Sequence, residues 1–245
     1  MTADGESKID FSQIDFESGA FSEEVLGLGN PYYLQLEYFK QWAKQHEIFL
    51  EGTDKNRIHL SKNGFVPEND RVELDKIPGI LVAAKTLYQI PDTILEVMKG
   101  KTIYFSTELG RSKAIFSAWG TDSVNKGIIL EQNIRPINVI HEIGHIVDVH
   151  GIQGKFKEKN NVFSEVKEKH QKIFSSKTNF GKDSQGIPIG YISTYSTEDD
   201  LENFAEHFAY YVVRPDFFRE KTNQDPVLDE KYDFLRDHIF DGKEF

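Results

Sequence analysis

The spacing of apolar residues predicts several helices in the first hundred residues of the chain. A helix is expected from Pro31, and its buried side would carry four apolar residues: Leu34, Tyr38, Phe39 and Trp42. Two shorter helices are expected over residues 79–87 and 93–98. Residues 57–60 favour a short strand, and residues 63–75 favour a loop.

The apolar pattern then changes to that of β-strands. Residues 101–107, 113–119 and 127–131 are rich in Ile, Phe and Tyr, which is typical of strands. The polar segment at 120–126 can form a hairpin loop between the last two. Helical spacing returns in four later segments, at about residues 137–149, 157–175, 199–213 and 226–239.

These elements together predict an α+β fold, organised as one domain with two lobes around a cleft. A lobe over about residues 30–135 would hold a small mixed sheet, and a helical lobe over about residues 136–245 would follow it. Residues 1–29 are acidic and weakly periodic, which is typical of a loosely held arm. No segment approaches 18 consecutive apolar residues, so we expect no membrane span.

Composition and charge narrow the possible classes of function. The 245 residues include no cysteine, so any metal must be bound by His, Asp or Glu. The net charge of −11 argues against a nucleic-acid partner. It is typical either of a protein that attracts basic peptides or of one whose charge only keeps it soluble. The first residues lack the basic start and apolar core of a signal peptide. We therefore expect either a cytoplasmic protein or one whose export signal lies outside this sequence.

The candidate chemistry begins in the segment VIHEIGHIVDVH, residues 139–150. His141 and His145 are four residues apart, so on a helix they project from one face and can bind the same ion. Glu142 is placed to take a proton from a water that the metal has made acidic. Gly144 is unfavourable inside a helix, which suggests the close approach of another backbone. A surface helix with two structural histidines is the alternative interpretation.

A catalytic zinc site needs a third protein ligand. A third histidine six residues beyond His145 is excluded, because that position is Gly151. Glu165, on a later helical segment, is a second choice. The best candidates are Glu202 and Glu206 in the segment TEDDLENFAEHFAYY, because they lie one turn apart on one helix face. One carboxylate could bind the metal while the other accepts the N–H of a ligand histidine, although an ordinary acidic helix would show the same pattern.

The segments HEIGHIVD and ENFAEHFAYY, with a tyrosine seven residues before the second, resemble the catalytic-domain family of anthrax lethal factor. That family includes the secreted Pro-Pro endopeptidases, and the resemblance covers about residues 100–240. It implies a zincin-like fold with one zinc ion bound by His141, His145 and Glu202. It also implies that Glu142 is the general base.

The same resemblance implies two further roles around the metal. Glu206 becomes the acceptor behind a ligand histidine, and Tyr195 becomes the hydroxyl that stabilises the oxyanion or assists the leaving amine. Tyr191 is close by in the sequence, so spacing alone selects Tyr195.

The remaining histidines have no expected role in catalysis. His207 follows Glu206 but points about 100° away from it on a helix, so a structural role is expected. The sequence identifies no partner for His150, His170 or His238.

The expected function is that of a zinc-dependent endopeptidase of bacterial origin, which the resemblance implies is secreted or delivered outside the cell. Its substrate would be one protein or a restricted set of proteins. An extended peptide could pair with the strand at 113–119, where Trp119 could line a side-chain pocket. The alternatives are a catalytically silent zinc-binding module that recognises a peptide, and the effector domain of a larger toxin with a translocation partner.

Overall fold

The structure is a computed structural model of the chain. It describes residues 31–53, 58–61, 64–67, 73–74, 79–106, 114–117, 127–131, 134–153, 163–175 and 181–245. The predicted arm at 1–29 and the predicted hairpin loop at 120–126 lie outside these residues. Among the described helices, none is both long and apolar enough to cross a membrane.

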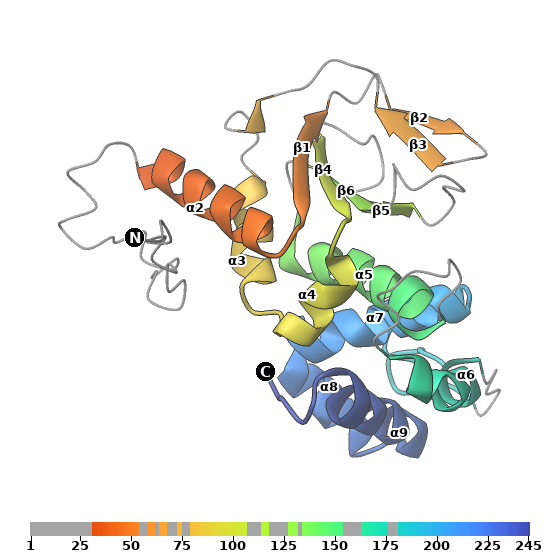
Figure 1. Cartoon of the computed structure of the whole chain (residues 1–245). Helices are drawn as coiled ribbons and strands as arrows, with labels where there is room; N and C mark the ends of the chain where they lie inside the picture. The colour runs from red at the N-terminus through yellow and green to blue at the C-terminus, as the bar shows by residue number, and fades with distance from the viewer. Residues whose placement is uncertain are drawn as a thin grey trace.

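A mixed four-stranded sheet forms the upper part of the molecule in Figure 1. Its strand order is β1 (Phe49–Thr53), β4 (Thr102–Ser106), β6 (Gly127–Glu131) and β5 (Ala114–Ser117). The first three are parallel, and β5 pairs with β6 in the antiparallel direction. The predicted strands at 101–107, 113–119 and 127–131 are therefore confirmed, and β5 lies at one edge of the sheet.

The strands near the N-terminus were predicted less well. The predicted strand at 57–60 is confirmed as β2 (Ile58–Ser61), which pairs with β3 (Gly64–Pro67). The prediction of a loop over 63–75 is wrong for β3, and β1 was not predicted at all. Both missed strands are short and contain glycine, so their sequences carry little strand signal, and pairing with a neighbour defines them.

Three helices accompany the sheet, as predicted: α2 (Pro31–Gln45), α3 (Ile80–Leu87) and α4 (Asp92–Met98). On α2, Phe39 and Trp42 are buried as predicted, whereas Tyr38 is only half-buried. The side chain of Leu34 lies outside the part of the structure that is described.

The second half of the described chain is mainly helical, as predicted, and lies below the sheet in Figure 1. Its helices are α5 (Pro136–Ile146), α6 (Lys167–Phe174), α7 (Asp200–Val213), α8 (Pro215–Thr222) and α9 (Pro226–Phe234). The helix predicted at 157–175 is confirmed only from Lys167, because residues 164–166 form a 3₁₀ turn and residues 157–162 lie outside the described residues. Helices α5 and α9 each continue as a π-helix, Val147–Ile152 and Leu235–Ile239. Helix α8, which begins at Pro215, was not predicted.

Helices α5 and α7 lie side by side, and this contact builds the candidate site (Figure 1). A Cβ atom placed on Gly144 would lie 2.9 Å from the Cα of Ala205. The close backbone approach predicted from Gly144 is therefore confirmed. Around it, Ile140 and Ile143 of α5 share the apolar core with Phe208 of α7, so the two helices form a rigid base for polar side chains.

Candidate metal centre

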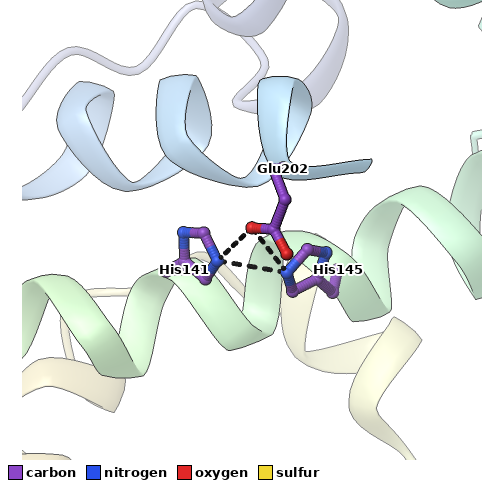
Figure 2. A group of neighbouring side chains, drawn as sticks. All are labelled: His141, His145 and Glu202. Atoms are coloured by element: carbon purple, nitrogen blue, oxygen red, sulfur yellow. Dashed lines mark hydrogen bonds and ion pairs between the residues drawn. The ribbon is translucent and has the colours of Figure 1, made fainter. Parts of the chain in front are cut away.

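Three side chains from α5 and α7 point toward one another in the contact between these helices (Figure 2). His141 and His145 come from the middle and the end of α5, and Glu202 comes from the first turn of α7. The two Nε2 atoms are 3.1 Å apart, and Glu202 Oε2 lies 2.9 Å from His141 Nε2 and 3.4 Å from His145 Nε2. Within the described part of the chain, this is the one group of three such residues close enough to hold a metal ion.

Local structure explains why these side chains converge. The histidines are one turn apart on α5, which begins at Pro136, a residue whose fixed φ suits the first helical turn. Helix α7 is capped by Asp199, whose Oδ1 accepts the backbone N–H of Glu202 at 2.9 Å. The cap places Glu202 in the first turn, where the helix dipole favours its negative charge.

Glu206 determines which nitrogen of His141 faces the centre. Its Oε1 lies 3.0 Å from His141 Nδ1. Because a carboxylate only accepts hydrogen bonds, Nδ1 carries the proton and donates it, and in the neutral ring Nε2 keeps its lone pair. That lone pair points toward His145 and Glu202, so the arrangement prepares His141 as a metal ligand.

The residues present fit a small divalent cation. All three candidate ligands have little exposure, and Glu202 Oε2 is a buried oxygen that makes no hydrogen bond of good geometry with any described residue. An imidazole lone pair beside a carboxylate oxygen needs a positive charge between them. A metal ion bound by nitrogen and oxygen donors would satisfy these atoms together.

The pKa shifts of the three candidate ligands also indicate that a positive charge is favoured between them. Burial lowers the pKa of His141, but the close carboxylates of Glu202 and Glu206 outweigh burial and raise it to about 9. Burial lowers the pKa of His145. Burial raises the pKa of Glu202, yet the two histidines together hold it far below its usual range. Without a metal, a second proton on His141 makes its ring cationic. That ring therefore supplies the positive charge beside His145 and Glu202.

Glu142 is buried beside the first candidate ligand. Burial raises the pKa of its carboxyl to about 7, the charge on His141 opposes this rise, and Glu202 adds to it. The Glu142 carboxyl therefore interacts electrostatically with two of the three candidate ligands. A carboxyl with a pKa near neutrality can take up and release a proton under physiological conditions.

Tyr195 stands beside the centre, in a short 3₁₀ turn over Tyr195–Thr197. The centroid of its ring is 5.7 Å from that of His141, and about half of the residue is exposed (51%). Burial of the hydroxyl, followed by the charge of Glu202 and a hydrogen bond with it, raises the pKa of Tyr195, so the hydroxyl stays protonated. Tyr191 faces elsewhere, with its ring 4.8 Å from the Nζ atom of Lys231.

Of the two other candidates, Glu165 does not belong to the centre. Glu165 is exposed in the 3₁₀ turn Ser164–Val166 and belongs to no candidate metal group. Trp119 lies outside the described residues.

The structure identifies partners that sequence reasoning missed. His170 Nε2 lies 3.4 Å from Asp148 Oδ1, and His238 Nε2 lies 2.8 Å from Lys169 Nζ. His207 is fully buried, with its Nδ1 2.6 Å from the carbonyl oxygen of Asn203, which agrees with a structural role.

Sequence reasoning also missed Ser193, which contacts the partner of a candidate ligand. Its hydroxyl donates to Glu206 Oε2 at 2.5 Å. No signal in the sequence identifies this contact, because serine is common in loops and lies here 13 residues from its partner.

The centre thus combines three potential metal ligands with a buried carboxyl, Glu142, and a hydroxyl, that of Tyr195. No protein-family model matches the chain, and no curated protein matches it. Function is therefore inferred from the residues of the centre and their surroundings.

Proposed function

We propose that the protein is a zinc-dependent endopeptidase with a zincin-like catalytic domain. The convergence of His141, His145 and Glu202 carries this proposal, because two histidines and one glutamate are an established ligand set of catalytic zinc sites. The resemblance to the lethal factor family rests on the same residues. Neighbouring Glu142 and Tyr195 supply the acid–base and hydrogen-bonding groups that peptide hydrolysis requires.

The proposed mechanism assigns a separate task to each side chain. Zinc, when bound, would act as a Lewis acid that polarises the scissile carbonyl and acidifies a water. Glu142 takes the proton of the attacking water and passes it to the leaving amine. The Tyr195 hydroxyl donates a hydrogen bond to the developing oxyanion. Glu206 retains the Nδ1 proton of His141 and so keeps Nε2 directed at the centre.

The sheet edge beside α5 is the proposed peptide-binding surface. Among the described strands, β5 pairs with β6 alone, and α5 packs against β5. An extended peptide that pairs with the other edge of β5 would run along the helix that carries both histidines. We propose that this edge binds a restricted protein substrate.

The experiment that tests the function compares the wild-type protein with Glu142→Gln on a randomised peptide library. Both proteins should contain one zinc ion per chain, because Glu142 is not among the ligands. Only the wild type should cleave peptides, since an amide cannot accept the proton of the attacking water. Equal cleavage by both proteins, or a wild type without zinc, would contradict the proposal.

Zinc in the wild type without any turnover would instead favour a catalytically silent module that recognises peptides. The resemblance also leads us to propose that the protein acts outside the cell that makes it, either alone or as part of a larger toxin. Detection of the protein in the culture medium of its producer would test that location.

A further inference from the structure

We propose that Ser193 is a positioning residue that joins the metal ligand His141 and the Tyr195 turn into one hydrogen-bonded unit. This inference rests on the proposed function and extends it to a residue with no contact to the metal ligands themselves. Two sets of contacts support it, one toward the metal centre and one within the turn.

The contacts toward the metal centre pass through Glu206. Ser193 Oγ donates to Glu206 Oε2 at 2.5 Å, while Glu206 Oε1 lies 3.0 Å from His141 Nδ1. Because a partner holds each oxygen, the carboxylate cannot rotate freely. The orientation of the His141 ring therefore depends on the Ser193 hydroxyl, one residue further from the metal than Glu206.

The contacts within the turn are reciprocal between Ser193 and Ser196. The backbone N–H of Ser196 donates to Ser193 Oγ at 3.1 Å, and the backbone N–H of Ser193 donates to Ser196 Oγ at 3.2 Å. Ser196 Oγ also donates to the carbonyl oxygen of Ser193 at 2.7 Å. Ser196 is fully buried, so the turn is anchored in the protein.

Tyr195 lies between these two serines in the chain. The hydroxyl that holds Glu206 thus also holds the turn that presents Tyr195 to the centre. Because the Ser193 hydroxyl both donates and accepts, its loss would leave Glu206 Oε2 without its donor and the Ser196 N–H without its acceptor. A serine that only stabilised the loop would influence the turn but not the metal ligand.

The experiment measures zinc affinity by chelator competition in variants of the turn. Ser193→Ala should weaken zinc binding by about 10-fold or more, the usual effect of losing an outer partner of a ligand histidine. Ser193→Thr, which keeps the hydroxyl, should bind zinc as the wild type does. Thr197→Ala is the matched control, because its hydroxyl bonds the Thr194 carbonyl in the same turn at 2.7 Å and does not contact Glu206.

The second readout is turnover, measured with and without Tyr195→Phe. Ser193→Ala should lower kcat more than it raises KM, and adding Tyr195→Phe to it should cost less than Tyr195→Phe costs alone. Ser196→Ala removes the two turn contacts made by the Ser196 hydroxyl, but keeps its backbone N–H bond to Ser193 Oγ and the bond from Ser193 to Glu206. It should therefore lower kcat while zinc affinity stays within about twofold of the wild type.

The outcomes separate this inference from the proposed function. A wild type that binds no zinc overturns both. A wild type that binds zinc, together with a Ser193→Ala protein whose zinc affinity matches that of Thr197→Ala, overturns only the inference. If Ser193→Ala does not fold, the isosteric pair Ser193→Thr and Ser193→Val replaces it, and equal zinc affinity in that pair overturns the inference.

Discussion

At the scale of single residues, the two tyrosines before α7 separate catalysis from packing. The ring of Tyr195 lies next to His141, whereas the ring of Tyr191 covers the ammonium group of Lys231. Tyr195→Phe should lower kcat by about 10²–10³, which is the usual cost of one lost oxyanion donor, and should leave zinc content unchanged.

Tyr191→Phe is the control for this prediction, because it keeps the ring that faces Lys231 and removes only the hydroxyl. Its kcat should stay close to that of the wild type. The assignment of Tyr195 would be wrong if steady-state kinetics showed the larger loss in Tyr191→Phe.

A second prediction at the residue scale concerns the buried carboxyl of Glu142. In the metal-free protein, burial raises its folded-state pKa to about 7, above the ordinary value of 4.5. Between these two pH values the unfolded chain releases this proton and the folded chain keeps it, so the carboxyl lowers the free energy of unfolding as pH rises. Metal-free Glu142→Gln should therefore be more stable than the metal-free wild type at pH 8, by on the order of 1–3 kcal/mol.

Urea denaturation of both metal-free proteins at pH 4 and pH 8 measures this difference. At pH 4 the carboxyl is protonated in the folded state and mostly protonated in the unfolded chain, so the two proteins should have nearly equal stability. A difference that is the same at both pH values would show that the substitution acts through packing.

At the scale of elements, the contact between α5 and α7 determines the geometry of the centre. Gly144→Ala would place its Cβ 2.9 Å from the Cα of Ala205, a backbone atom that cannot move without its helix. We expect this overpacking to cost about 1–3 kcal/mol, more than the roughly 1 kcal/mol that alanine gains in helix propensity. Zinc affinity should fall as well, because the ligands are divided between the two helices.

Thermal unfolding and chelator competition measure these two effects. Glu168→Ala on α6 is a suitable control, since this helix residue is exposed and should change neither quantity. Unchanged zinc affinity in Gly144→Ala would show that the spacing of the two helices is not what aligns the ligands.

Elements with a strong local signal were predicted well from the sequence, and those defined by their partners were not. The spacing of His141 and His145 is a property of one helix, so it could be interpreted without a structure. The roles of Glu202 and Glu206 could not be distinguished by spacing, because both lie on one face of α7, and only their distances to the two nitrogens of His141 separate them. The role of Ser193 could not be predicted, because it depends on a hydrogen bond between a loop residue and Glu206 of α7 that forms only in the folded chain.

At the scale of the whole molecule, the proposed metal joins segments that are distant in the sequence. His145 and Glu202 belong to helices separated by α6 and by the loop before α7. Because zinc would bind the folded chain and not the unfolded one, it should stabilise the fold, by about 4 kcal/mol when free zinc exceeds the Kd about 1,000-fold.

Calorimetry with added zinc and with a chelator measures this stabilisation. The melting temperature of the wild type should fall when the metal is removed. Glu202→Gln should melt at the same temperature in both conditions, because a neutral amide is a poor ligand. A wild type whose melting temperature does not depend on zinc would argue against a metal that joins α5 and α7.

The most direct test of the central claim is a crystal structure of the zinc-loaded protein with data collected on both sides of the zinc absorption edge. We predict one anomalous peak between α5 and α7, about 2.0–2.2 Å from His141 Nε2, His145 Nε2 and a carboxylate oxygen of Glu202. A peak elsewhere, or a zinc ion bound without Glu202, would contradict the account.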